Sequence, residues 1–181
     1  LGVGEAPDAA LYGDLGSNTL ANVSKAVGGV NLPNMEKLGF GKITNVLNMN
    51  NTGIATVGRL SEDSVGNDST TGHWELAGLT TKTEFKIFEN GFPKDLIQNI
   101  EKEANCQFIG NRHASGTEII EELGNQHIET GDLILYTSGD SVFQIAAHNK
   151  VCRIEKLYEI CKISRKYCNQ YNIGRVIARP F

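Results

Sequence analysis

Residues 133–141 read Leu-Ile-Leu-Tyr-Thr-Ser-Gly-Asp-Ser, and this stretch decides the fold. The uninterrupted apolar and aromatic run at 133–136 indicates a strand that is buried in a sheet covered by helices. Small polar residues follow at its carboxyl end, where side chains in α/β proteins often face a ligand cleft. The stretch therefore predicts an α/β layer and the edge of the sheet at which a site would lie.

The segments before this strand alternate between helix and strand, as an α/β layer requires. Phe92-Pro93 opens a helix whose apolar positions share one face. These positions are Leu96, Ile97, Ile100 and Ala104. A short strand is expected over 106–109, broken by Gly110-Asn111. A capped helix is expected over 117–123 and should end at Gly124.

The segments after residue 141 continue the alternation. A strand is expected over 142–147 and a last strand over 175–179, which Pro180 should stop. Apolar residues from Ile154 to Cys168 mark a helix between them.

The first part of the chain predicts short helices joined by loops. One helix is expected over 19–27, closed by Gly28-Gly29, and another over 32–39 with a proline near its first turn. The Asn-rich residues 42–52 indicate a surface loop, and residues 54–60 a strand.

Residues 66–79 read Gly-Asn-Asp-Ser-Thr-Thr-Gly-His-Trp-Glu-Leu-Ala-Gly-Leu, with three hydroxyls before a run, 73–79, that can be helical. At a helix start, unpaired N–H groups and the helix dipole favour an anion beside such a hydroxyl. This geometry suits a nucleophile that accepts a phosphoryl group. An ordinary N-cap is the alternative, and the pattern alone favours it.

Residues 68–75, Asp-Ser-Thr-Thr-Gly-His-Trp-Glu, resemble the phosphorylation motif of the phosphopentomutases, which belong to the alkaline phosphatase superfamily. That family has Asp-Thr-x-Thr-Gly-His-Trp-Glu, and its first hydroxyl carries the phosphoryl group, which places that role on Ser69. The replacement of Thr by Ser keeps an alcohol oxygen. Three further motifs match in order: Gly-Glu-Ala-Pro-Asp-Ala at 4–9, Ala-Ser-Gly-Thr-Glu-Ile-Ile at 114–120, and Arg-Val-Ile-Ala-Arg-Pro-Phe at 175–181.

The resemblance implies an α/β fold: a partial alkaline-phosphatase-like core with an inserted α/β cap domain. Residues 1–82 would be the N-terminal part of the core, and residues 83–181 the cap, which contacts the substrate. The positions implied to contact the pentose phosphate are Ser138, Asp140, Val142, Arg175 and Ile177. An Asp accepts hydrogen bonds from sugar hydroxyls and an Arg clamps a phosphate, although the pattern alone fits a surface Asp and a solvated Arg.

The activity implied is the interconversion of ribose or deoxyribose 1-phosphate and 5-phosphate through a phosphoenzyme. The cofactors implied are two manganese ions, with Ser69 as one ligand, and a sugar bisphosphate activator. The family's remaining Asp and His metal ligands lie outside the matched residues, so we expect a fragment that is inactive alone. A non-catalytic sugar-phosphate-binding remnant and a phosphatase of the same superfamily remain as alternatives, the latter weakened by the cap motifs.

Net charge, apolar runs and cysteine spacing indicate which partners and sites are not expected. The formal net charge is -4 over 181 residues and no basic cluster occurs, so nucleic acid is not expected as a partner. No apolar run is long enough to cross a membrane, and no signal peptide is visible. Four cysteines without Cys-x-x-Cys spacing predict free thiols rather than a zinc site, which fits the cytoplasm.

Overall fold

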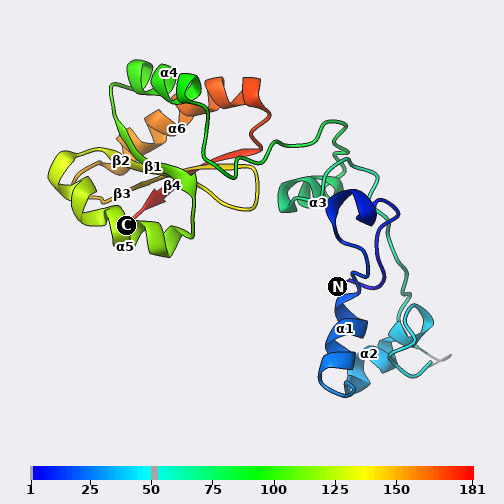
Figure 1. Ribbon diagram of the computed structural model, residues 1–181. Coiled ribbons are helices and arrows are strands. Elements are labelled where there is room, and N and C mark those ends of the chain that lie inside the picture. Colours follow the sequence, from blue (N-terminus) through cyan, green and yellow to red (C-terminus); the bar gives the residue numbers. More distant parts are fainter. Residues whose placement is uncertain (1, 50–52) are drawn as a thin grey trace. The chain divides into compact units, whose positions relative to one another are not determined.

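The computed structural model describes residues 2–49 and 53–181 as a mixed α/β chain (Figure 1). It divides into two compact units between Asp63 and Ser64. This division differs from the predicted boundary between core and cap at 82/83, which concerns the domains of the complete protein. That boundary stays a prediction.

The first unit contains only short helices. They are η1 (Ala9–Tyr12), α1 (Thr19–Ala26), α2 (Pro33–Leu38) and η2 (Phe40–Lys42). Asn18 caps α1 by accepting a hydrogen bond from the backbone N–H of Ala21 at 3.2 Å. The prediction of two helices is confirmed, whereas the strand predicted over 54–60 was wrong: described residues 53–63 form no strand. A strand needs a neighbour for its hydrogen bonds, and within the described residues of this unit no other strand supplies one.

The second unit contains a four-stranded sheet, four α-helices and one short 3-10 helix. They are α3 (Ser69–Leu76), α4 (Lys94–Ala104), β1 (Phe108–His113), α5 (Gly116–Thr130), β2 (Leu133–Thr137), β3 (Val142–Ala147), α6 (Ile154–Cys168), η3 (Asn169–Tyr171) and β4 (Arg175–Pro180). The strand order is β1-β2-β3-β4. The two outer pairs are parallel and the central pair is antiparallel.

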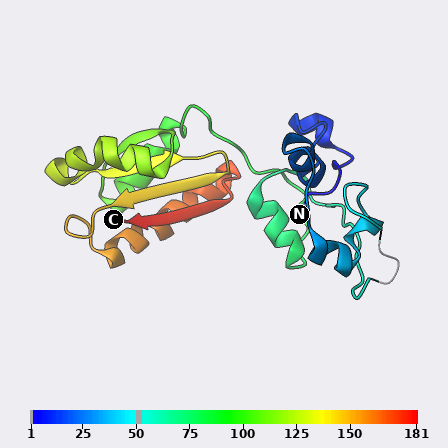
Figure 2. The ribbon, with the colours of Figure 1, turned by 90° about the horizontal axis from the view of Figure 1, so that it is seen from below.

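Helices cover both faces of this sheet, with α5 on one side and α6 on the other (Figure 2). Alternate residues of β2 divide between the faces, as strand geometry requires. Leu133 and Leu135 join the larger core with α4 and α6. Ile134 and Tyr136 join a smaller core with Ile119 of α5. All five residues of β2 are buried, so the prediction of a buried strand in an α/β layer is confirmed.

Two predicted ends in the sheet region were wrong. Gly110-Asn111 does not end β1 but forms a bulge, since the register with β2 shifts between Gly110 and Arg112. Helix α5 passes through Gly124 and ends at Gly131, whose φ is 83°. Its buried positions continue at helical spacing to His127, and this packing offsets the cost of one internal glycine, about 1 kcal/mol.

Helix α3 also differs from the prediction, because it begins at Ser69 and ends at Leu76 instead of covering 73–79. Asp68 explains the early start. Its carboxylate accepts hydrogen bonds from the backbone N–H groups of Thr70 and Thr71 at 2.9 and 3.1 Å. The hydroxyl residues therefore form the first turn itself. Among the described residues, no helix has the length and apolar character needed to span a lipid bilayer.

Candidate functional site

One pocket of about 280 Å³ collects all five positions that the resemblance assigns to the substrate. They are Ser138, Asp140, Val142, Arg175 and Ile177. The pocket lies on the face of the sheet that carries α5. Ser138 and Asp140 come from the connection between β2 and β3, whereas the other three come from β3 and β4. The structure thus brings together residues that lie up to 39 positions apart in the chain.

The strand register explains why these residues meet. Val142 pairs with Arg175, and Gln144 pairs with Ile177, in the parallel ladder between β3 and β4. Residues two apart on a strand share a face, so the same face continues to Arg179. Tyr136 of β2 pairs with Gln144 and enters the pocket from the other side.

Sequence reasoning missed six further members of the pocket. They are Ala114, Ser115, Gly116, Tyr136, Gln144 and Arg179. A signal for two of them was present, because Gln144 and Arg179 each lie two residues after a position that had been singled out. The contribution of the start of α5 has no such signal, since it depends on how the helix packs on the sheet.

Asp140 and Arg175 form an ion pair within the pocket. Arg175 Nη2 donates to Asp140 Oδ2 at 3.1 Å, and the two side chains are 39% and 35% exposed. An ion pair with this exposure contributes about 0–1 kcal/mol to stability, so its role need not be structural. Arg175 Nε is buried and has no acceptor among the described residues. The Arg175 guanidinium therefore has one N–H donor that none of the described residues accepts.

Ser69 is the accessible hydroxyl of the motif at 68–75. Thr70 and Thr71 are 5% and 0% exposed, whereas Ser69 is exposed. The Thr71 hydroxyl also donates to Asp68 Oδ2 at 2.7 Å, which ties it to the helix cap. Ser69 Oγ lies 3.3 and 3.4 Å from the two carboxylate oxygens of Asp140 and donates there. The hydroxyl thus borders the residues that line the pocket.

The histidines act through backbone contacts. His73 Nδ1 contacts the carbonyl oxygen of Ser69 one turn earlier in α3. His127 is fully buried, and its Nδ1 contacts the carbonyl oxygen of Asp132 at 2.7 Å. Its Nε2 accepts from the backbone N–H of His148 at 2.9 Å, so His127 ties the end of α5 to the end of β3.

The described residues do not by themselves fit a two-manganese site. No group of three or more His, Cys, Asp or Glu side chains converges among residues 2–49 and 53–181. The two carboxylates near Ser69 already have partners among the described residues, since Asp68 caps α3 and Asp140 pairs with Arg175. Other residues would have to supply the ligands.

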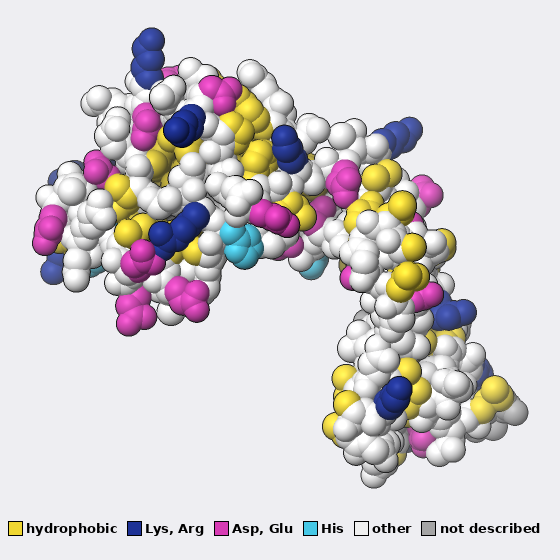
Figure 3. All heavy atoms as spheres, in the orientation of Figure 1, with side chains coloured by type: hydrophobic (Ala, Val, Ile, Leu, Met, Phe, Trp, Pro, Cys, Tyr) yellow, Lys and Arg dark blue, Asp and Glu magenta, His cyan; other side chains and the backbone are white. Residues whose placement is uncertain are grey.

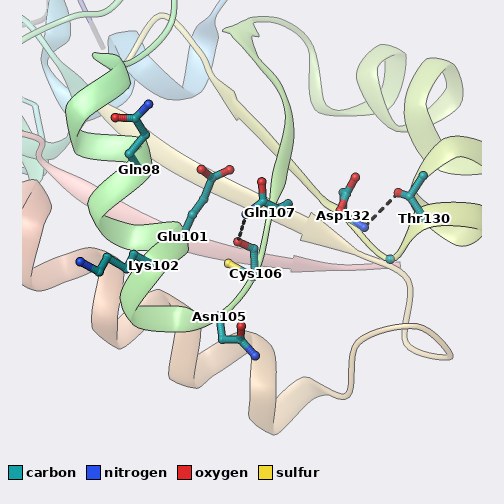
Figure 4. Close-up of a pocket in the computed structure, with 9 residues that line it drawn as sticks. Gln98, Glu101, Lys102, Asn105, Cys106, Gln107, Thr130 and Asp132 are labelled. Atoms are coloured by element: carbon teal, nitrogen blue, oxygen red, sulfur yellow. Dashed lines mark hydrogen bonds between the residues drawn. The ribbon is translucent and has the colours of Figure 1, made fainter.

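A larger hollow, of about 630 Å³, lies where α4 and α5 end (Figure 4). Two of its polar side chains are engaged by the backbone: Glu101 accepts from the N–H of Phe108 at 2.9 Å, and Gln107 donates to the carbonyl oxygen of Cys106. Burial raises the pKa of the Cys106 thiol to about 11, so this group is a poor nucleophile at neutral pH. None of the residues predicted for the site lies there.

On the face that Figure 3 shows, charge does not mark out another site. Figure 3 shows Lys and Arg side chains scattered over the visible surface among Asp and Glu side chains. The pocket on the α5 face instead combines two arginines, one carboxylate and several hydroxyl or amide groups. Such a set suits a small, polar, anionic ligand.

No protein-family model matches the chain. Among curated proteins, the chain is 53% identical over 184 residues to a phosphopentomutase of Carboxydothermus hydrogenoformans. It is 51% identical over 185 residues to the phosphopentomutase of Thermotoga maritima, and 52% identical over 184 residues to that of Dictyoglomus thermophilum. Each match covers 100% of this chain and 47% of the relative.

Over its whole length, the chain is homologous to the phosphopentomutases. It spans about half the length of the curated relatives it matches. The mixed α/β architecture agrees with a partial alkaline-phosphatase-like fold, as the four motifs predict. The motifs at 68–75, 114–120 and 175–181 each supply residues that line this pocket or border it.

Proposed function

We propose that the complete protein to which this chain belongs is a phosphopentomutase that interconverts pentose 1-phosphates and 5-phosphates. In this proposal, the pocket on the α5 face holds the sugar phosphate and Ser69 carries the phosphoryl group. The observation that carries the proposal is the convergence of Ser138, Asp140 and Arg175, with two apolar neighbours, in one pocket beside Ser69. The names of the relatives support the same reaction.

Each side chain in the pocket suits one part of a pentose phosphate. Asp140 accepts hydrogen bonds from sugar hydroxyls, and Arg175 pairs with a phosphate through its unoccupied Nε donor. Val142 and Ile177 supply apolar contact for the carbon face of the ring. The Gln144 side-chain amide donates to Ser138 Oγ at 3.3 Å and orients that hydroxyl.

The proposed chemistry is a phosphoryl transfer in two directions. A sugar hydroxyl attacks the phosphorus of phosphorylated Ser69. The bond from phosphorus to Ser69 Oγ breaks as the new ester bond forms, and the proton that the attacking hydroxyl loses is balanced by one that Ser69 Oγ gains as it leaves as a free hydroxyl. After the sugar bisphosphate reorients, the other phosphoryl group returns to Ser69. Manganese would neutralise the phosphoryl oxygens and activate the alcohol, and we propose that most of its ligands come from the remainder of the complete protein.

Two alternatives concern the chain alone. The pocket is built within residues 64–181, and the described residues hold no metal cluster. The 181-residue chain is therefore proposed to bind a sugar phosphate without turning it over, as a remnant would. A phosphatase of the same superfamily would release inorganic phosphate instead. We also propose that the complete protein acts in the cytoplasm, and that its core and cap domains meet between residues 82 and 83.

The test uses the complete protein with Mn²⁺ and a sugar bisphosphate, and follows ribose 1-phosphate conversion. Arg175→Ala should lower kcat/KM by roughly ten- to a hundredfold, because it removes a charge-assisted contact, and Arg175→Lys should recover part of that. Phosphopeptide mapping should locate the phosphoryl group on Ser69. Label on Thr70 or Thr71, release of inorganic phosphate as the main product, or unchanged kcat/KM in a folded Arg175→Ala variant would each contradict the proposal.

A further inference from the structure

The pocket has a second end, where α5 begins, formed by Ser115, Gly116, Tyr136 and Arg179. We call this the α5 end. A Cβ placed on Gly116 would lie 2.7 Å from Tyr136 Oη and 2.9 Å from Arg179 Nη2. A hydroxyl and a guanidinium therefore stand directly against the first turn of the helix, and a side chain at 116 would require at least one of them to shift.

The first turn of α5 adds unpaired donors at this place. The helix has 15 residues, and its N-cap, Ser115, makes no side-chain cap hydrogen bond. The first intrahelical bond runs from the N–H of Ile119 to the carbonyl oxygen of Ser115, so the N–H groups of residues 116–118 precede the helical ladder. Together with the helix dipole, such groups favour an anion. Glu118, the acidic residue of this turn, is exposed and does not line the pocket.

Tyr136 gives an independent sign of a missing acceptor. The residue is only 1% exposed, yet its hydroxyl has no hydrogen-bond partner among the described residues. A buried hydroxyl without a partner costs free energy, so native structures rarely leave one unsatisfied. Burial raises the pKa of Tyr136, while the positive charge of Arg179 acts the other way. The phenol thus stays protonated at neutral pH and can donate into the pocket.

We propose that the α5 end is an anion subsite that binds a phosphomonoester through the first-turn N–H groups, the Tyr136 hydroxyl and the Arg179 guanidinium. The identity of the ligand as a sugar phosphate rests on the proposed function; the preference for a phosphate dianion rests on the geometry alone. A sugar bisphosphate carries two phosphates, and the pocket offers one arginine toward each: Arg175 beside Ser69, and Arg179 at the α5 end. The subsite would hold the phosphate that is not reacting.

The test is an NMR titration of the 181-residue chain with inorganic phosphate, with ribose as the uncharged control. The backbone N–H signals of residues 116–118 should shift and saturate with phosphate and stay in place with ribose. Tyr136→Phe and Arg179→Met should each weaken phosphate binding by roughly tenfold or more. Arg153→Met removes an exposed arginine outside the pocket and should leave binding unchanged. Unaltered signals of α4 and α6, on the other face of the sheet, confirm that each variant is folded.

Absence of phosphate-dependent shifts at 116–118, or undiminished binding in both pocket variants, would overturn the subsite. The complete protein separates this inference from the proposed function. If it lacks mutase activity while phosphate binds at the α5 end, the function fails and the subsite stands. If it is an active mutase whose KM for ribose 5-phosphate is unchanged in Tyr136→Phe and Arg179→Met, the subsite fails and the function stands.

Discussion

The two units of this chain differ in what their apolar side chains do. In the second unit, both faces of the sheet are packed, and residues such as Leu135, Phe143 and Ile145 are fully buried. In the described part of the first unit, the buried apolar residues are Ala9, Leu20 and Leu47. Many others there are exposed, including Leu11 at 81% and Leu60 at 93%, and hydrophobic side chains appear on its surface in Figure 3.

This difference indicates which unit is the more stable and which unit carries the pocket. A unit needs a buried face to offset the entropy of ordering its chain. The second unit has one, and the pocket is built on its sheet. The described part of the first unit buries few apolar side chains. The chain as a whole spans 47% of the length of its relatives. The exposed apolar residues of the first unit therefore lack the burial that the sheet and its helices give to those of the second unit.

Hydrogen exchange on the intact chain gives the largest expected contrast. Backbone amides of β2 and β3 should exchange roughly a thousandfold more slowly than those of α1 and α2, because ~4 kcal/mol of additional opening free energy corresponds to three powers of ten. Mass spectrometry of peptic fragments measures this directly. Equal protection in the two units would break the comparison, since the first unit would then be held as firmly as the sheet.

Truncation of a core residue should give the next largest effect. Leu135→Ala removes a fully buried side chain between β2 and the helices α4 and α6, and we expect a loss of about 2–5 kcal/mol in the free energy of unfolding. Leu11→Ala is the matched control at an exposed position, with an expected change within about 0.5 kcal/mol. Urea denaturation followed by circular dichroism compares them. A loss for Leu11→Ala as large as that for Leu135→Ala would refute the contrast.

The sequence predicted much of the second unit and less of the first, for a physical reason. The run at 133–136, and the helix spanning 154–168, were readable because burial imposes a periodic pattern. The predicted strand at 54–60 was wrong because an apolar segment reveals its partner only in three dimensions. The predicted helix end at Gly124 was wrong for a related reason. Packing along α5 as far as His127 outweighs the tendency of one glycine to end a helix.

The site divides in the same way. Ser69 and the five pocket positions came from motifs, and strand periodicity could have added Gln144 and Arg179. Tyr136 was read correctly as part of a buried strand, but its unpaired hydroxyl is visible only once the start of α5 is placed against it. His127 was likewise unremarkable in the sequence, because its two backbone partners lie on different segments.

Alkaline pH should weaken the second unit by a smaller amount, since all four cysteines belong to it. Burial raises the pKa of Cys161 to about 11 and that of Cys168 to about 12, from 9.0. A raised thiol pKa stabilises the fold fully below pH 9, and this stabilisation is lost as the pH rises toward the folded-state values. Between pH 8 and pH 10, we expect about 2–3 kcal/mol to be lost through these two thiols together.

The Cys168→Ala variant isolates one of these thiols. Its free energy of unfolding should fall less between pH 8 and pH 10 than that of the parent chain, by about 1 kcal/mol. Chemical denaturation of both proteins at pH 8 and pH 10, under reducing conditions, gives the four free energies of unfolding. An identical fall in the two proteins would show that the thiol keeps its ordinary pKa in the folded state.

The Asp140–Arg175 pair should have the smallest effect on stability. Both side chains are more than a third exposed, so Asp140→Asn should change the free energy of unfolding by no more than about 1 kcal/mol. A thermal melt of the 181-residue chain measures it. A much larger loss would mean that the pair supports the second unit structurally, and that the pocket is part of its core.

The central claim is that the second unit carries a sugar-phosphate pocket independently of the first. Titration of ribose 5-phosphate into the 181-residue chain, followed by NMR, tests it most directly. The account predicts saturable shifts at Ser138, Asp140, Arg175 and their neighbours on β3 and β4, and unchanged signals for residues 2–49. Saturable shifts confined to the first unit, or no shifts in the pocket at millimolar ligand, would contradict it.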